Sequence, residues 1–406
     1  MIVVSAPKPA QRNRLPSSYL VWLGGALTSQ LGSAAMFFAL TWAATAHGGT
    51  AAGLVLSSIV APSVLFVLVG GAVGDRAGAR RVMLTCDAVM VIVAVAVAVT
   101  AGAIGTPVAL LLIAGVLTGV NDAFYYPSSG SMPRRMVEPK HLGRAVALRQ
   151  SGVHLVRTVG APVGGALVAF GGLSFVAWVD AGTFLVAFTV LLLIRPRFTP
   201  PAPEVRRHIA RETLDGVLVV FRTPGLGTVL LLIAAVAGVF LPVGSLLVPL
   251  LAREHTWGAH AAGILVGALG LGTVLVTLVV ARVGTYRLPG LAASGACAVT
   301  GFGVAAIGVA PSLPVAVAGA FVAGAGVGTF VSHLAPVLLS AAPESHLARV
   351  QAVFSLIQSV SLLVMSAGLG AIAHALGPVA TVGLCATVLT LCAVTGFASR
   401  QVRHLR

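Results

Sequence analysis

Charged side chains are scarce in this chain. Only 9% of its 406 residues are Asp, Glu, Lys or Arg, whereas a soluble domain carries roughly 25%. Hydrophobic residues make up 58%, and the mean hydropathy is +1.02. A chain with so few charges cannot cover a surface that faces water. The composition therefore excludes a soluble globular protein and indicates one that is embedded in a membrane.

Lysine is almost absent, and so are the short motifs of common enzymes. The two lysines, Lys8 and Lys140, both follow a proline, so neither completes the Gly-Lys-Ser/Thr of a phosphate-binding loop. The chain also lacks a His-Glu-x-x-His and a Gly-x-Ser-x-Gly. We expect no enzymatic activity, no cofactor and no metal site. Any work that this protein does across a membrane would draw on an ion gradient.

Cysteine is rare as well. The four cysteines lie in apolar segments at spacings that suit no metal ion, so we expect packing residues and no disulfide framework. Residues 1–17 are basic and contain prolines, without the apolar core and cleavage site of a signal peptide. We therefore expect these residues to form a cytoplasmic tail.

Long apolar segments are abundant. Stretches of roughly 20 residues, the length that crosses ~30 Å of hydrocarbon, recur about twelve times. None shows the alternation of a membrane β-strand. The sequence therefore predicts an all-α membrane protein with twelve transmembrane helices. The expected helices cover 18–46, 52–74, 82–103, 107–129, 146–170, 174–194, 226–252, 260–281, 288–310, 314–340, 350–375 and 378–399.

The basic residues gather on one side of this arrangement. All of the 25 except Arg157 and Arg253 fall in the terminal tails or near the loops after every second helix. The positive-inside rule makes that side cytoplasmic. We expect a multi-pass monomer, surrounded by lipid in the cytoplasmic membrane of a bacterium, with both termini inside. The distribution also accounts for the net charge of +15 without a nucleic-acid partner.

The second half of the chain repeats the first. Residues 141–147 (HLGRAVA) reappear as 346–352 (HLARVQA), and Gly165 and Gly172 recur as Gly370 and Gly377. We expect two pseudo-symmetric six-helix bundles, with any substrate held between them. The predicted organisation is a tail 1–17, bundles 18–194 and 226–399, a linker 195–225 with a short amphipathic helix near 205–221, and a tail 400–406.

Residues 70–84 (GGAVGDRAGARRVML) lie between the second and third expected helices. The stretch resembles the Gly-x-x-x-Asp-Arg-x-Gly-x-Arg signature of the major facilitator superfamily, whose transporters have the fold predicted above. The resemblance implies a gating role for this motif. The second half of the chain contains an incomplete copy of this motif, with Arg282, Gly284 and Arg287 conserved in position and Ala281 in place of the aspartate. The motif residues are Gly71, Asp75, Arg76, Gly78, Arg80 and Arg81.

Three further segments narrow the resemblance. Residues 123–127 (AFYYP), 142–147 and 157–165 (RTVGAPVGG) resemble the branch that contains enterobactin-exporter-like and macrolide-efflux-like proteins. The last segment also resembles an antiporter signature, through Gly160, Pro162, Gly164 and Gly165, although ordinary small-residue packing explains it equally well. One departure is Gly115, which stands where many drug–proton antiporters carry an arginine four residues before a glycine, here Gly119.

These resemblances imply a secondary transporter, an exporter of amphipathic small molecules driven by proton entry. An uptake permease of the same fold is the first alternative. A membrane receptor or lipid-handling protein that transports nothing is the second, and the nearly empty external loops argue against it.

Ionisable residues inside membrane helices are costly, so each is a functional candidate. Asp122 and Arg157 fall deep in the fourth and fifth helices, with Asn121 and His154 nearby. We expect those two helices to be neighbours. The pair then forms either a structural ion pair or a proton-coupling site.

Other polar residues are weaker candidates. Asp180, near the external end of the sixth helix, is a second candidate for proton coupling, whereas Asp87 is expected to pair with loop arginines. Gln30, Asn121 and Gln358 are expected in the substrate cavity. His333 is either a cavity residue or a hydrogen-bonded packing residue.

We predict that Asp75→Asn is expressed normally but loses most transport. The Asp75 carboxylate would brace the two bundles only while the cytoplasmic gate is closed, and an interaction present in one state alone shifts the equilibrium. The variant should therefore favour the inward-open state, which transport assays and distance measurements between the bundles will report. Full transport by Asp75→Asn excludes this role.

Overall fold

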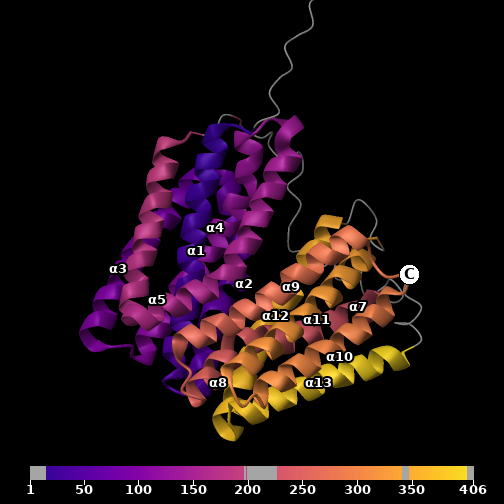
Figure 1. Cartoon of the computed structure of the whole chain (residues 1–406). Helices are drawn as coiled ribbons and strands as arrows, with labels where there is room; N and C mark the ends of the chain where they lie inside the picture. Colours follow the sequence, from indigo (N-terminus) through magenta and orange to yellow (C-terminus); the bar gives the residue numbers. More distant parts are fainter. Residues whose placement is uncertain (1–14, 196–197, 199–225, 341–346, 400–406) are drawn as a thin grey trace, which may run out of the picture.

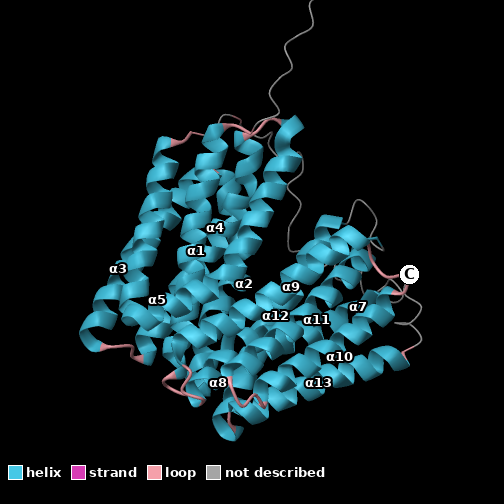
Figure 2. Cartoon of the chain, in the orientation of Figure 1, coloured by secondary structure: helices cyan, strands magenta, loops and turns pink. Residues whose placement is uncertain are grey.

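The computed structural model describes residues 15–195, 198, 226–340 and 347–399, and these residues form helices and short connections without a strand (Figure 2). Helices of the first half end at glycines in left-handed conformations, such as Gly48, Gly78 and Gly105. Glycine adopts a positive φ at little cost, so the chain reverses there sharply. The helices of this half are α1 (Ser17–Thr45), α2 (Gly49–Ala77), α3 (Ala79–Ile104), α4 (Val108–Met136), the 3₁₀ turn η1 (Pro139–His141) and α5 (Leu142–Leu193).

The second half follows the same plan. Prolines begin α10 and α13 at the first helical position, where a missing backbone N–H costs nothing. The helices are α7 (Leu226–Pro242), the π-helical turn η2 (Val243–Leu247), α8 (Val248–Glu254), α9 (Gly258–Val283), α10 (Pro289–Gly308), α11 (Leu313–Ser340), α12 (Leu347–Leu376) and α13 (Pro378–Ala398).

The long helix α5 contains two membrane crossings. Its 52 residues would extend about 78 Å at 1.5 Å per residue, more than twice the ~30 Å of hydrocarbon. The backbone leaves the helical conformation at Gly171 and Gly172, where Gly172 has φ 67°. Eleven helices in the described part of the chain are long and apolar enough to cross a membrane, α5 among them. Counting α5 twice gives the twelve crossings that the sequence predicts.

The helices form two bundles (Figure 1). In the first, α5 packs against α1 and α3, and α2 packs against α4; in the second, α10 packs against α11 and α13. The repeat is visible in the backbone, because Gly78 and its counterpart Gly284 have φ values of 89° and 91°. Gly172 and its counterpart Gly377 also share a positive φ. The fold class is therefore confirmed.

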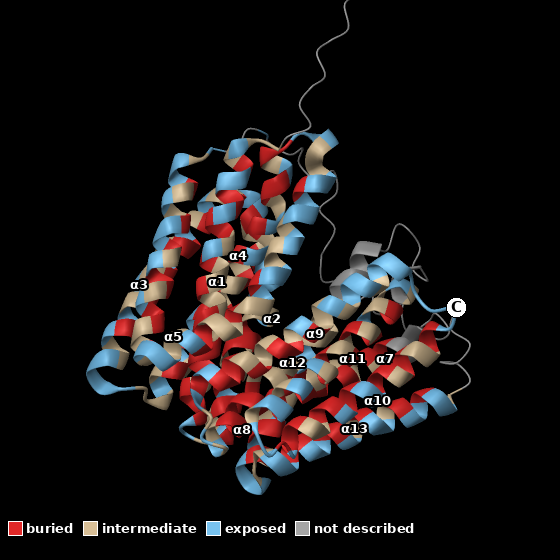
Figure 3. Ribbon diagram, in the orientation of Figure 1, coloured by how far each residue is buried: buried red, intermediate tan, exposed pale blue. Residues whose placement is uncertain are grey.

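The helix faces that point away from the bundles are apolar and exposed (Figure 3). Leu65 and Ile92 of the first bundle and Phe302 of the second have exposed fractions of 70%, 69% and 70%. Exposed large apolar side chains of this kind suit contact with lipid, not water. Nearly all of the predicted linker and both tails, including the expected amphipathic helix near 205–221, lie outside the described residues.

Two glycine crossings join the bundles. The first lies between α2 and α12, where a Cβ on Gly53 would lie 3.2 Å from the Cα of Gly370. The second lies between α5 and α9, where a Cβ on Gly165 would lie 3.0 Å from the Cα of Gly263. Small residues let membrane helices approach closely and gain van der Waals contact. The repeat relates the two crossings, since Gly165 and Gly370 are counterparts.

Both crossings lie in one half of the molecule. We call the side that carries the Gly78 and Gly284 turns the basic side, and the side that carries Gly48, Gly172 and Gly377 the opposite side. The crossings lie toward the opposite side, where Figure 1 shows the bundles meeting near α8. Toward the basic side, the bundles diverge. The structure is therefore closed on the opposite side.

We predict that Gly370→Val separates the bundles on the opposite side. A Cβ at Gly370 would lie 2.6 Å from the carbonyl oxygen of Gly49, and overpacking of this kind costs roughly 1–3 kcal/mol. That cost shifts a two-state equilibrium about 5- to 150-fold. Spin labels at positions 104 and 309, one in each bundle, should report a longer distance.

Gly368→Val is the matched control, because nothing lies within 4 Å of a Cβ at this exposed glycine on the same helix. If both variants keep the wild-type distance, the crossing does not hold this side closed.

Candidate functional site

A cavity of about 530 Å³ lies between the two bundles. Residues of α1, α2, α4 and α5 form one wall, and residues of α7, η2, α9 and α12 form the other. The lining residues come from the middle of their helices, so the cavity lies near the centre of the molecule. The glycine crossings lie between it and the opposite side.

Asp122 and Arg157 both line this cavity, yet they do not form an ion pair. Between described residues, the one ion pair within 4.0 Å joins Glu138 to Lys140 on the α4–α5 connection, at 2.8 Å. There the hydrogen bond from Lys140 lowers the pKa of the exposed Glu138 carboxyl. Asp122 has no hydrogen-bond partner in the described part of the chain.

The helix packing explains the separation of Asp122 from Arg157. We expected α4 and α5 to be neighbours, and that expectation is wrong. The N-terminal half of α5 packs along α1 and α9, whereas α4 packs against α2 and α3. The two residues therefore approach the cavity from helices that hardly touch.

The first-bundle wall carries the charge and most of the polar groups. Besides Asp122 and Arg157 it presents Gln30 and several hydroxyl groups, from Ser33, Thr41, Ser63 and Thr118. Gln30 thus lines the central cavity, and its contact with a substrate stays a prediction. A ligand with a charged or hydrogen-bonding group would meet its partners on this wall.

The second-bundle wall is apolar. Its larger side chains are Phe240, Leu241, Val266, Leu269 and Leu362. The Ser245 and Thr273 hydroxyls donate to backbone carbonyls, at 2.8 Å to Leu241 and 3.0 Å to Leu269. The Ser33, Thr41 and Ser63 hydroxyls of the first-bundle wall donate to backbone carbonyls in the same way. The walls therefore differ in the charges of Asp122 and Arg157 and in the Gln30 amide. The cavity therefore has two chemically different walls, which suits an amphipathic ligand.

Three of the predicted site residues lie outside the cavity lining. Asn121 is buried, and His154 is exposed beyond the lining. Asp180 is 1% exposed and lies against Gly32 of α1. The Thr183 hydroxyl donates to the backbone oxygen of Asp180 at 2.8 Å, while the Oδ2 atom of Asp180 has no partner among the described residues.

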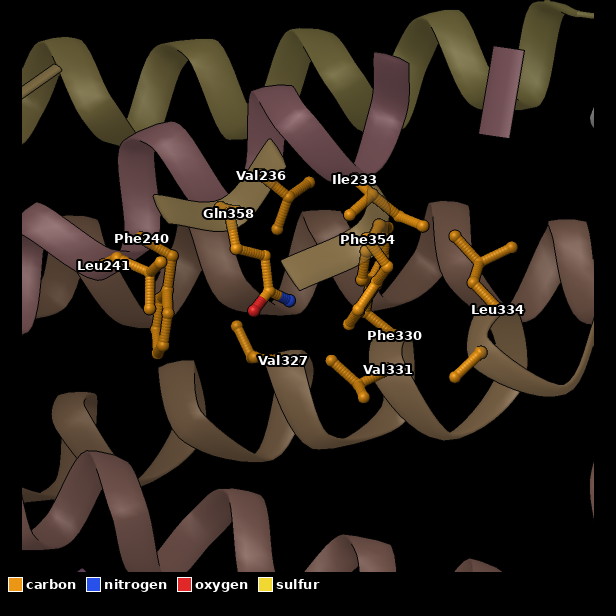
Figure 4. Close-up of a pocket in the computed structure, with 12 residues that line it drawn as sticks. Ile233, Val236, Phe240, Leu241, Val327, Phe330, Val331, Leu334, Phe354 and Gln358 are labelled. Atoms are coloured by element: carbon orange, nitrogen blue, oxygen red, sulfur yellow. The ribbon is translucent and has the colours of Figure 1, made fainter. Parts of the chain in front are cut away.

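His333 is a hydrogen-bonded packing residue. Its Nδ1 donates to the Thr329 carbonyl at 2.8 Å, and its Nε2 accepts the backbone N–H of Tyr286 at 3.1 Å. Both ring nitrogens are used, and the ring fixes the α9–α10 connection against α11. Gln358 lines a smaller pocket beside the central cavity (Figure 4).

In the 70–84 motif, Arg80 has a role that the sequence did not suggest. Its Nε donates to the carbonyls of Leu191 and Ile194 at 3.0 Å, and Nη2 donates to Leu192 at 3.1 Å. The last carbonyls of a helix lack intrahelical partners, and a cation there also suits the helix dipole. Arg80 thus caps the C-terminal end of α5.

Within this motif, the side chains of Asp75 and Arg76 are not used by contacts with other described residues in this conformation. Asp75 and Arg76 are exposed and have no hydrogen-bond or ion-pair partner in the described part of the chain. Arg81 is also exposed, and a Cβ at Gly71 would lie 3.9 Å from the Pro127 Cβ of α4.

The antiporter-like segment packs against two helices at once. Gly160 and Gly164 allow α1 to approach at Ala34 and Ala35, while Gly165 and Pro162 meet α9 at Gly263 and Gly267. The segment therefore joins a contact within the first bundle to a contact between the bundles.

Gly115 has a packing reason of its own. A Cβ there would collide with the Ser58 hydroxyl of α2, so an arginine has no room at this position. This close contact between α4 and α2 accounts for the missing arginine.

Two residues were misjudged from the sequence. Asp87, expected to pair with loop arginines, is fully buried, and neither carboxylate oxygen has a partner among the described residues. Arg253, for which the sequence predicted no contact, joins the bundles: Nε donates to Thr45 Oγ1 at 2.8 Å, and the guanidinium lies 4.6 Å from the Trp42 ring centre. Its position as the one basic residue of the external loops was the available signal.

The chain is similar to known proteins in sequence and in structure. The sequence profile of the Major Facilitator Superfamily matches residues 22–366. The chain is 26% identical over 346 residues to the multidrug efflux pump Tap of Mycolicibacterium fortuitum, covering 82% of this chain and 84% of Tap. It is 30% identical over 255 residues to the enterobactin exporter EntS of Shigella boydii serotype 18, covering 58% of this chain and 56% of EntS.

Solved structures share the fold. A mutant of the nucleoside transporter NupG superposes with a TM-score of 0.78 at 12% identity, covering 94% of this chain and 99% of that one. A bacterial homologue of the human lysosomal transporter Spinster, in an inward-facing, unoccupied conformation, gives 0.74 at 16% identity, covering 97% and 98%. At such identities the likeness concerns the fold alone.

We predict that Arg80→Ala destabilises the protein, whereas Arg76→Ala does not. Removing Arg80 leaves three helix-end carbonyls without their charged donor, which should lower the free energy of unfolding by about 1–2 kcal/mol. Arg76 makes no such bonds. Thermal unfolding of the purified variants in detergent measures the difference. Equal stability of the two variants would contradict the capping role.

Proposed function

The chain belongs to the major facilitator superfamily, and on that premise we propose that this membrane transporter is a proton-driven exporter of amphipathic small molecules. The contrast between the two cavity walls carries the proposal. Asp122 and Arg157 on one wall offer charges, and the phenylalanine and leucine side chains of the other offer apolar contact. An amphipathic molecule satisfies both walls, whereas a fully polar metabolite would leave the second wall unused.

The direction of transport is supported by the relatives and by the distribution of charge. Both reported relatives are named as exporters, a multidrug efflux pump and an enterobactin exporter. We assign the basic side to the cytoplasm on the positive-inside rule, which places both termini inside. The conformation is then closed to the outside, and the cavity takes its ligand from the cytoplasm or the inner leaflet.

Asp122 is the proposed site of proton coupling. A carboxylate in a cavity of low polarity is costly to leave charged without a partner, and no described residue pairs with Asp122 in this conformation. A proton removes that cost, and so does a ligand that donates a hydrogen bond or carries a positive charge. Competition between proton and ligand for one carboxylate couples proton entry to efflux, if each conformation favours a different occupant.

The alternating movement is proposed to exchange one set of inter-bundle contacts for another. The glycine crossings and the Arg253–Thr45 bond hold the outer side closed in the present conformation. Asp75 and Arg76, now exposed at the basic side, would make their contacts when that side closes.

Transport by inverted membrane vesicles tests the function. Vesicles that contain the protein should accumulate a fluorescent aromatic cation when acidified inside, and a protonophore should abolish the accumulation. Accumulation by right-side-out vesicles in place of inverted ones would support the uptake permease. Accumulation that is unchanged after the protonophore is added would exclude proton coupling.

We predict that Asp122→Asn abolishes uphill accumulation, to the level of vesicles without the protein, while downhill exchange persists. The amide keeps the shape of the carboxyl group but cannot ionise. Glu138→Gln makes the same change to an exposed carboxyl group outside the cavity, on the α4–α5 connection, and is the control that should retain accumulation.

The contrary result is uphill accumulation by Asp122→Asn with the wild-type dependence on pH. Asp122 would then be structural, and Asp180 would be the next carboxylate to test.

A further inference from the structure

The opposite side of the molecule has few fixed charges and a large share of the histidines. Among the residues that the structure describes there, Glu254 is the one acidic side chain and Arg253 the one basic side chain. Histidine ordinarily gains or loses its charge between about pH 5 and pH 8. The charge of this side therefore depends on the pH of the solution that it faces. Its histidines are His47, His255, His260 and His374.

Two of these histidines lie on either side of the first glycine crossing. His374 belongs to α12 of the second bundle, one helical turn beyond the glycine of that crossing. A Cβ on Gly48 would lie 3.1 Å from the His374 Nδ1 atom, and a Cβ on Gly49 would lie 2.9 Å from its backbone nitrogen. His47 of the first bundle directly precedes Gly48, and its Nε2 atom lies 2.7 Å from the Thr106 carbonyl oxygen. Both histidines are exposed to solution. We call them the histidine pair.

His374 lies beside the N-terminal end of α2, which belongs to the other bundle. Gly48 is the residue before this helix, and no side chain caps it. The first N–H groups of a helix have no acceptor within the helix, and they give that end a partial positive charge. A neutral imidazole offers a lone pair there, whereas an imidazolium adds a second positive charge. The closed arrangement therefore disfavours the protonated form of His374.

The other ionisable groups of this side offer little compensation. Glu254 is exposed and forms no ion pair with a described residue. Arg253 is positively charged itself, and its guanidinium donates across the boundary to Thr45 Oγ1 at 2.8 Å. His255 stacks on a tryptophan of its own connection, and His260 is exposed at the start of α9. Protonation of either would add positive charge to the second bundle.

From this arrangement we propose that the histidine pair is a pH sensor that opens the outer side when the external solution is acidic. Neutral histidines allow α2 and α12 to meet, whereas protonated ones place like charges on the two bundles. Interactions within one bundle, such as that of His374 with the end of its own helix, are the same in both conformations and cancel. The contacts across the boundary differ between the conformations, so they shift the equilibrium.

This inference rests on the proposed function and adds a regulation to it. A proton-driven exporter has an acidic solution outside whenever its driving gradient is present. External protons would then favour the conformation that releases ligand outward and lets a proton reach Asp122. The glycine crossings lie between the histidine pair and the central cavity. The pair therefore acts on the boundary between the bundles and not on the proton-coupling carboxylate.

Spin labels at positions 104 and 309 report the opening of the outer side. Their distance is measured on the purified full-length protein in lipid nanodiscs, at about pH 8 and about pH 5. In the wild-type protein, the ratio of open to closed molecules should rise about fivefold at the lower pH, which is the order of effect of a charge at a helix end.

Two substitutions of His374 should act in opposite directions. His374→Gln keeps a polar side chain but cannot ionise, so it removes both the repulsion within the pair and the charge beside α2. It should remove most of the response to pH and stay closed. His374→Lys is charged at both pH values, and it should favour the open arrangement already at the higher pH.

Two further variants are controls. His141→Gln removes a histidine from the basic side, on the α4–α5 connection, and should keep the wild-type response. Asp122→Asn prevents the cavity carboxylate from titrating, and it should also keep the response. Thermal unfolding should show that all of these variants remain folded.

The outcomes separate this inference from the proposed function. A wild-type distance that is the same at both pH values, or a response that His374→Gln keeps, overturns the sensor even when vesicle transport is intact. A response that either control removes also overturns it, because another group would then cause the pH dependence, and so does a His374→Lys variant that stays closed. A response that His374→Gln removes and both controls keep supports the sensor, even when vesicles show no proton-driven accumulation.

Discussion

The cost of placing charge and unpaired backbone groups in hydrocarbon governs this molecule. Helices satisfy their own N–H and C=O groups, so a chain that is 58% hydrophobic crosses the membrane as helices. The charges that remain are confined to the basic side or to the few positions where the fold gives them a cavity or a partner, except for Asp87 and Asp180, which are buried with carboxylate oxygens that have no partner among the described residues. Arg80, bonded to three helix-end carbonyls, illustrates the second case.

The same constraint makes small residues important. Lipid tails are as apolar as leucine side chains, so helices in a bilayer associate through close packing and not through removal from water. At Gly53–Gly370 and Gly165–Gly263 the backbones nearly touch. Such contacts depend on geometry and contain no ion pair, so they can close and reopen without moving charge through hydrocarbon. That property suits the moving boundary between two bundles of a transporter.

The interior of the molecule separates chemical roles between its halves. The first bundle contributes every ionisable side chain among the described residues that line the central cavity, whereas the second bundle lines it with apolar side chains and two hydroxyls and contributes no charge. A repeat that began as two similar halves has therefore diverged where it faces the ligand. The second-half copy of the 70–84 motif, with Ala281 in place of Asp75, shows the same divergence at the basic side.

The sequence by itself determined the number of crossings, the two bundles and the family. Those features follow from local properties: the length of each apolar segment, the glycines at the turns, and the spacing of the repeat. It also singled out Asp122, Arg157 and Gln30 as functional candidates, since an ionisable or amide group is rarely left in a membrane helix without a purpose, and these three residues line the central cavity. Only the tertiary structure decided which helices touch. It separated α4 from α5 and so left Asp122 and Arg157 unpaired, buried Asp87 and Asp180, and joined Arg253 to Trp42 and Thr45. Contacts of this kind depend on how helices far apart in the chain rotate and cross, and no pattern within one segment encodes the partner that it will meet.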